Sequence, residues 1–141
     1  MSFTEVELDY LATQPLGRLA TVQPNGTLQV NPVGFSYNRG TGTIDIGGFN
    51  MAASRKYRNV ADNGRVAFVV DDLASMDPWR VRCLEIRGRG EAIGEPVDSA
   101  SRSAGSIIRI HPERILSFGI DDLDTEPHKL VANIRNVEPG A

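Results

Sequence analysis

The chain has 141 residues, 40% of them hydrophobic and only 6% aromatic, and it contains 14 glycines and 8 prolines. This length and turn-rich composition predict a single globular domain over residues 1–141 that is built mainly from short strands, which argues against an all-helical fold. The net charge of -3 excludes a surface made as a whole to grip nucleic acid, and the single cysteine, Cys83, excludes an internal disulfide.

The N-terminal segment "FTEVELDYLA" is typical of a short helix. Thr4 is placed to cap it, Glu7 completes a capping box three residues later, and Phe3 can pack against Leu8. The helix should stop before Pro15. No apolar run here resembles a signal peptide or a membrane span, so we expect a soluble cytoplasmic protein with no membrane partner.

The hydrophobic period then changes to two, which indicates strands. The run "RLATVQPNGTLQVNPVGFSY" predicts two antiparallel strands around Asn25-Gly26, a pair typical of a type I′ hairpin turn. A second turn at 38–42 leads into "TIDIGGF", where Ile44 and Ile46 share one face. These three strands are expected to form a meander.

Helical spacing returns after Met51 and ends at "DNG", residues 62–64. The unbroken apolar run in "RVAFVVDD" predicts a strand buried on both faces. In the long strand "WRVRCLEIRGRGEAIG" a phase slip predicts a bulge near Cys83 and Leu84. The stretch 95–105 fits either a loop or one weak helical turn.

The last strand, "SIIRIHPERILSFGI", is expected to break or bend at His111-Pro112, and the polar tail 121–141 has room for a short helix around 130–134. Six strands, two short helices and antiparallel hairpins together favour a small β-barrel, because closure removes exposed sheet edges. An open sheet capped by helices is the alternative.

Positive charge is concentrated after Gly47 and Gly48, where a strand ends and a helix begins. Helix N-termini present unpaired N–H groups to anions, so a phosphate suits this position. The donors that can converge there are Ser54, Arg55, Lys56 and Asn59. A solvated basic helix face explains the same residues about equally well.

A second candidate site lies in "VNPVGFSY". Pro32 lacks the N–H of a central strand and Gly34 lacks a side chain, so strand pairing should lapse there. A planar ligand lying against Asn31, Pro32, Val33 and Gly34 would then meet free backbone groups. An edge strand with a bulge is the alternative.

Trp79 and Arg80 begin a strand directly after Pro78. A large ring with one polar atom suits a ligand wall or a subunit contact, although for Trp79 considered alone a core position is favoured. His111 and His128 lie far apart in sequence and from Cys83, so we expect no metal site, and no residue pattern assigns a catalytic nucleophile or base.

Taken in order, the segments "GRLATV", "GTLQVNPVGFSY", "IDIGGF", "SRKYRNV", "VAFVVDD", "DPWRVRCLEIRGRGEAI" and "IRIHPERI" resemble a split β-barrel family that binds flavins and deazaflavins. That family includes pyridoxamine 5'-phosphate oxidases, and the resemblance covers about residues 5–120. It is nearest to the actinobacterial branch that uses the deazaflavin coenzyme F420.

The resemblance implies a mainly β fold, a six-stranded antiparallel split barrel with short flanking helices, and a homodimer with cofactor sites at the subunit interface. It places the cofactor phosphate at Ser54, Arg55, Lys56 and Asn59 and the ring at 31–34, with Trp79 and Arg80 contributed by the partner subunit. The cofactor is then coenzyme F420, with FMN as the alternative. The tail lacks the arginine- and histidine-bearing motif of pyridoxamine phosphate oxidases, which argues against vitamin B6 oxidation.

The expected function is that of an oxidoreductase that transfers a hydride from the reduced deazaflavin to a small unsaturated organic substrate. The cofactor carries such chemistry, so no acid or base residue is required of the protein. The alternatives are an FMN enzyme of the same fold, a carrier that binds the cofactor without turnover, and a dimeric barrel without cofactor.

Overall fold

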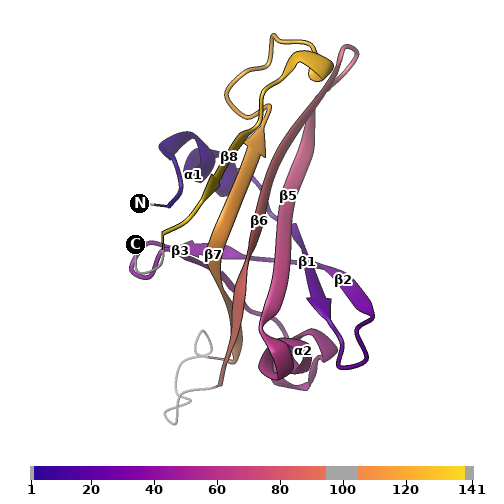
Figure 1. Ribbon diagram of the computed structural model, residues 1–141, viewed down its shortest axis with the longest axis vertical. Helices are drawn as coiled ribbons and strands as arrows, with labels where there is room; N and C mark the ends of the chain where they lie inside the picture. The colour runs from indigo at the N-terminus through magenta and orange to yellow at the C-terminus, as the bar shows by residue number, and fades with distance from the viewer. Residues whose placement is uncertain (1, 95–104, 139–141) are drawn as a thin grey trace.

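A computed structural model describes residues 2–94 and 105–138 of the chain. Within these residues it is a mainly antiparallel β protein with eight strands and two α-helices (Figure 1). The helices and short 3-10 turns are α1 (Glu5–Ala12), η1 (Met51–Ala53), α2 (Arg55–Asn63) and η3 (Pro127–Lys129). The strands are β1 (Gly17–Val22), β2 (Leu28–Val33), β3 (Ser36–Asn38), β4 (Thr43–Ile46), β5 (Arg65–Met76), β6 (Trp79–Ile93), β7 (Ile107–Phe118) and β8 (Asn133–Asn136).

The strands form one sheet in the order β2-β1-β5-β6-β7-β4-β3, and β8 adds to β7. The two ends of this hydrogen-bonded path, β2 and β3, are consecutive in the chain and are separated only by Gly34 and Phe35. The predicted count of six strands is wrong because the second predicted strand is divided at these two residues and because the tail supplies β8. The predicted meander therefore has a divided middle strand, with β2 paired to β1 and β3 paired to β4.

Helix α1 begins with the predicted capping box. The Glu7 backbone N–H donates to Thr4 Oγ1 over 3.1 Å, and the Thr4 N–H donates to Glu7 Oε1 over 3.0 Å, so two otherwise unpaired N–H groups are satisfied. Phe3 and Leu8 are both buried in the core. The Phe3 ring meets the edge of Tyr37 on β3, with ring centroids 5.4 Å apart, which holds α1 against this strand.

The turn between β1 and β2 is not the predicted type I′ turn. A type I′ turn needs positive φ at both central residues, and among the described residues Asn50 is the one non-glycine with positive φ. Gly26, with φ of 87°, is instead the last residue of a turn over residues 23–26, which its N–H closes by donating to the Gln23 carbonyl over 2.9 Å. Pro24 favours this arrangement because its fixed negative φ suits the first central position of an ordinary turn.

The core fills the inner face of the sheet, where Phe68 of β5 and Leu84 and Ile86 of β6 are at most 1% exposed. Strand β5 was predicted to be buried on both faces, but in the single chain its outward residues Ala67 and Val69 are only partly covered. The prediction is wrong for one chain because no element of the described residues lies over this outer face. An apolar outer face that the chain itself leaves partly exposed is typical of a surface that packs against another molecule.

The predicted bulge near Cys83 and Leu84 is absent, since Leu84 pairs in continuous register with Val70 of β5 and Ser117 of β7. One register shift falls instead at Arg87/Gly88, opposite Pro112. Strand β7 is therefore not broken at His111-Pro112 but is irregular there, as the bend prediction implied. Gly88 permits the close approach, because a Cβ at this position would lie 2.2 Å from the His111 carbonyl oxygen.

The predicted helix at 130–134 is wrong, because residues from Asn133 onward form β8 against β7. Figure 1 shows β8 between β7 and α1, so the tail lies beside the first helix. The stretch 95–105, predicted as a loop or weak helical turn, lies outside the described residues except for Gly105. Within the described ranges, no helix is long and apolar enough to span a membrane.

Candidate functional site

Helix α2 begins close to where the sequence predicted a helix, but Ser54 has a different role from the predicted one. Its Oγ accepts a hydrogen bond from the Tyr57 N–H over 3.3 Å and donates to the Met51 carbonyl over 2.6 Å. The hydroxyl proton that was expected to reach a phosphate is therefore used inside the protein. Ser54 is the helix cap, and Gly64, with φ of 69°, ends the helix where "DNG" predicted the stop.

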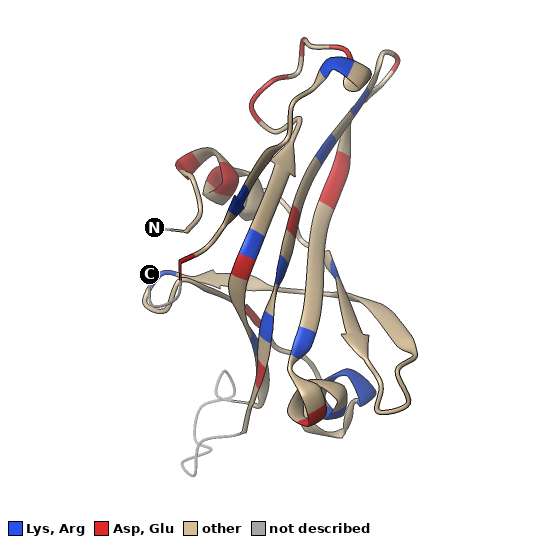
Figure 2. Cartoon of the chain, in the orientation of Figure 1, with Lys and Arg blue, Asp and Glu red and all other residues tan. Residues whose placement is uncertain are grey.

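The cations of α2 remain available. Arg55 and Arg58 are exposed and Lys56 is partly exposed, and none of the three forms an ion pair with any described residue. The backbone N–H groups of Arg55 and Lys56 belong to the first helical turn, which has no partners within the helix. Figure 2 shows basic residues gathered on α2 at the lower end of the molecule. This donor set, two backbone N–H groups beside unpaired cations, fits a phosphate.

Asn59 was predicted to point to the same anion, but it points into the protein and is 1% exposed. Its Nδ2 donates to Thr21 Oγ1 of β1 over 3.0 Å and to Gln29 Oε1 of β2 over 3.1 Å. On a helix Asn59 lies three positions after Lys56, yet the buried face of α2 begins at Asn59 and Val60. Asn59 therefore anchors α2 to the two strands.

The candidate ring segment lies at the end of β2 and is connected to α2. Gln29 Nε2 donates to Asn31 Oδ1 over 2.8 Å, so Asn31 is joined to Asn59 through Gln29. Pairing with β1 ends at Val33, which is 6% exposed, and lapses at Gly34 as predicted. A Cβ on Gly34 would meet no atom within 4 Å, so this backbone is open to a flat ligand.

Pro32 is exposed and stays in register with Arg18 of β1. The pairing therefore continues past Pro32, where it was predicted to begin to lapse. The sequence patterns predicted no role for Gln29 and Thr21. Gln29 was detectable, because residues two apart on a strand point to the same face and Gln29 stands two before Asn31. Thr21 was not, because its partner lies 38 residues away on a helix.

Trp79 and Arg80 are not brought to α2 within one chain. Strand β5 starts directly after α2 and runs for 12 residues to the hairpin that begins β6 at Trp79, a span of about 40 Å. Figure 1 shows this hairpin at the opposite end of the molecule from α2. Trp79 is 54% exposed, so the core position favoured for it alone is wrong. The Arg80 Nε donates to the Leu123 carbonyl over 3.0 Å.

Comparison with known proteins decides the family. Residues 3–125 match the family described as Pyridoxamine 5'-phosphate oxidase. The chain belongs to this pyridoxamine 5'-phosphate oxidase family. The resemblance drawn from the sequence motifs is confirmed by this match.

The oxidase-family chain is 47% identical over 132 residues to a 5a,11a-dehydrotetracycline/5a,11a-dehydrooxytetracycline reductase of Streptomyces rimosus, covering 91% of this chain and 92% of the relative. Among solved structures it is similar to a conserved hypothetical protein from Mycobacterium tuberculosis, at 20% identity and a TM-score of 0.69, over 88% of this chain and 89% of that one. It is also similar to an F420 reductase at 27% identity and a TM-score of 0.56, over 76% and 94% of the two chains.

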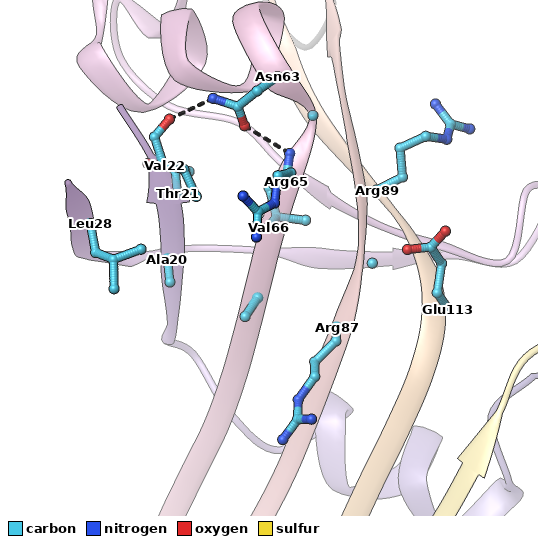
Figure 3. Close-up of a pocket in the computed structure, with 13 residues that line it drawn as sticks. Ala20, Thr21, Val22, Leu28, Asn63, Arg65, Val66, Arg87, Arg89 and Glu113 are labelled. Carbon is cyan, nitrogen blue, oxygen red and sulfur yellow. Dashed lines mark hydrogen bonds between the residues drawn. The ribbon is translucent and has the colours of Figure 1, made fainter. Parts of the chain in front are cut away.

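This family member has a hollow beside α2, on the outer face of β1, β5 and β6 (Figure 3). Its volume is about 460 Å³, and the predicted site residues do not line it. Asn63 closes one end by donating to the Val22 carbonyl over 2.7 Å and accepting from the Arg65 N–H over 3.0 Å. The hollow therefore lies on the outer face of the sheet, with Leu28 of β2 in its lining, whereas Asn31 has the opposite parity on that strand.

The Cys83 thiol of this family member lies in surroundings that disfavour its thiolate. Burial, with the nearby Asp71 and Glu85 carboxylates, raises the pKa of the Cys83 thiol to about 11, so the thiol stays protonated at neutral pH. No group of three His, Cys, Asp or Glu side chains within residues 2–94 and 105–138 is placed to hold a metal ion.

Proposed function

We propose that this chain is a reductase that binds the deazaflavin coenzyme F420 between β2 and α2 and uses it to reduce a small unsaturated organic substrate. Two comparisons support the proposal: a relative of nearly the same length is named a dehydrotetracycline reductase, and a similar structure is named an F420 reductase. FMN is the alternative cofactor, because both molecules carry a ribityl phosphate and a three-ring headgroup.

The observation that carries the proposal is the link between the unpaired cations of α2 and the open end of β2. Arg55 and Lys56, with their backbone N–H groups, would hold the phosphate, and helix α2 is tied by Asn59 through Gln29 to Asn31. The ring would lie along Asn31, Pro32, Val33 and Gly34. Anchoring both halves to one hydrogen-bonded unit keeps phosphate and ring sites at a constant separation.

When bound, the reduced deazaflavin supplies a hydride to an electron-poor carbon–carbon double bond, and a proton from solvent completes the reduction. The chain would position the cofactor and the substrate and would exclude part of the water from between them. Holding the donor and acceptor carbons in contact can lower a barrier by about 7 to 11 kcal/mol. No general acid or base is required from this chain, which suits a site whose identified groups are amides, cations and backbone.

The same proposal makes the working unit a homodimer. Trp79 and Arg80 lie about 40 Å of strand away from α2, so within one chain they cannot reach the site. A second copy would supply them, and it would cover the outer face where Leu28 is 77% and Val30 is 65% exposed. The proposal keeps the cytoplasm as the expected location.

A titration with coenzyme F420 and FMN side by side tests the proposal. Tight binding of the deazaflavin, followed by its oxidation in the presence of dehydrotetracycline or simpler enones, supports the reductase. A yellow protein with a flavin spectrum would assign FMN instead. Tight binding without oxidation by any substrate would indicate a carrier, and no binding of either molecule would overturn the proposal.

A further inference from the structure

Three side-chain amides form a continuous relay from the interior of the protein to the surface of β2. Asn59 Nδ2 donates to Gln29 Oε1 over 3.1 Å, and Gln29 Nε2 donates to Asn31 Oδ1 over 2.8 Å. The inner end is also held by Thr21 Oγ1, which accepts from Asn59 Nδ2 over 3.0 Å. Asn59 and Thr21 are each 1% exposed, whereas Gln29 and Asn31 are partly exposed.

The relay has a direction, because each amide has one donor end and one acceptor end. Gln29 accepts from Asn59 with its oxygen, so it meets Asn31 with its nitrogen and occupies the Asn31 oxygen. Asn31 Nδ2 is left with two N–H donors and no protein acceptor within the described ranges. The buried inner end stabilises this direction, since breaking hydrogen bonds in a low-dielectric interior is costly.

We propose that Gln29 is a positioning residue that fixes the Asn31 amide so that Asn31 Nδ2 donates to a carbonyl oxygen on the edge of the bound ring. This inference rests on the proposed function, since it requires a ring along β2. Both candidate cofactors carry such carbonyl oxygens. Reduction adds electrons to the ring and increases negative charge on this edge, so a donor there binds the reduced cofactor more tightly than the oxidised one.

The first test removes the relay without changing charge. Gln29→Met keeps a side chain of similar length but can neither accept from Asn59 nor donate to Asn31. We expect it to weaken binding of the reduced cofactor by about tenfold and of the oxidised cofactor by less than about threefold, which lowers the reduction potential of the bound cofactor. Gln23→Met is the matched control, because Gln23 lies on the same hairpin and its side-chain amide donates to Thr27 Oγ1 over 2.9 Å, away from Asn31.

A double-mutant cycle separates positioning from a structural role. If Gln29 acts through Asn31, Gln29→Met has no further effect on the reduced-to-oxidised affinity ratio in an Asn31→Ala background. If the ratio still changes in that background, or if both forms weaken equally in Gln29→Met, the inference is overturned. Denaturant unfolding of each variant establishes that the folded protein is being compared.

A second variant reverses the outer amide rather than removing it. Gln29→Glu still accepts from Asn59 but has no donor, so Asn31 should turn its Nδ2 inward and present Oδ1 to the ring. Relative to wild type, Gln29→Glu should lose more affinity for the reduced cofactor than for the oxidised one. This difference should be larger than the difference measured for Gln29→Met. If the ratio of the affinities for the reduced and oxidised cofactor is unchanged in this variant, the relay is overturned but the proposed function is not. Failure of the wild type to bind either cofactor would overturn the proposed function and this inference together.

Discussion

Glu7 and Arg135, 128 residues apart in sequence, form an ion pair that joins the first helix to the last strand. The Glu7 carboxylate is 1% exposed and also accepts from Thr4 and Ser117, while Arg135 donates further to the Ser2 carbonyl. Burial alone would raise the pKa of Glu7, but the hydrogen bonds from Arg135, Thr4 and Ser117 outweigh it and hold the pKa below its ordinary 4.5. The pair thus joins β8 to α1, in addition to the pairing of β8 with β7.

We expect Glu7→Gln to lower the free energy of unfolding at pH 7 by about 2 to 3 kcal/mol, because Arg135 loses its charged partner. Since the folded pKa of Glu7 is depressed, the unfolded state binds the proton first, and wild-type stability falls as the pH drops below about 4.5. The variant should show a shallower loss over this acid range. Urea titrations from pH 7 to pH 3 measure both effects, with the exposed Glu5→Gln as control.

Lys56→Ala tests the phosphate site. Removing a charged hydrogen-bond donor should weaken cofactor binding by about 1.5 to 3 kcal/mol, whereas the partly exposed side chain contributes little to folding. Isothermal titration at two salt concentrations checks this, since the wild-type affinity should fall with salt more steeply than that of the variant. Arg39→Ala removes another exposed cation outside the site and should bind normally. An unchanged dissociation constant for Lys56→Ala would remove the phosphate assignment.

Trp79→Ala should weaken cofactor binding by about tenfold through loss of a wall supplied by the partner subunit. Because Trp79 is 54% exposed in the single chain, the free energy of unfolding should change by no more than about 0.5 kcal/mol in dilute monomer. Because Trp79 is the single tryptophan of the chain, quenching of the cofactor's own fluorescence on titration gives the affinity. Val6→Ala, at an exposed apolar position on α1 away from Trp79 and Arg80, serves as control. Normal binding by Trp79→Ala would show that the indole lies outside the site.

The outer face of the sheet gives a separate test of the homodimer. Val30→Asp places a charge among the exposed apolar residues of β2, and it should convert a dimer to a monomer in analytical ultracentrifugation. Val131→Asp, at a position 90% exposed on the tail, should leave the dimer intact. A wild type that sediments as a monomer at high concentration would contradict the expected assembly.

Two glycines should respond in opposite ways to the same substitution. Gly88→Ala forces a Cβ to within 2.2 Å of the His111 carbonyl oxygen, which belongs to backbone and cannot turn away, so we expect a loss of about 1 to 3 kcal/mol in stability. Gly34→Ala meets open space and should fold normally. If the ring rests on this backbone, Gly34→Ala should still reduce cofactor affinity. Thermal melts and binding titrations distinguish the two effects.

Much of the local structure could be predicted from the sequence, because caps and periodicity act between neighbours in the chain. Thr4 and Glu7 correctly predicted the start of α1, and Gly64 correctly predicted the end of α2. The predicted type I′ turn is wrong although it too is local, because Pro24 before Asn25-Gly26 favours an ordinary turn with negative φ at its first central position. The lapse of pairing at Gly34 followed from residue types that cannot pair in a strand.

The sequence by itself determined the family, the positions of both helices and the basic charge of α2, since each depends on nearby residues. Only the tertiary structure decided that Asn59 points inward, that β8 replaces a helix, and that Trp79 stands a strand's length from α2. These outcomes depend on contacts between separate elements, such as Asn59 with Thr21, 38 residues away, and Arg135 with Glu7, 128 residues away. Burial and hydrogen bonding in the folded chain determine which distant residues come into contact, and the residues adjacent in sequence do not predict these contacts.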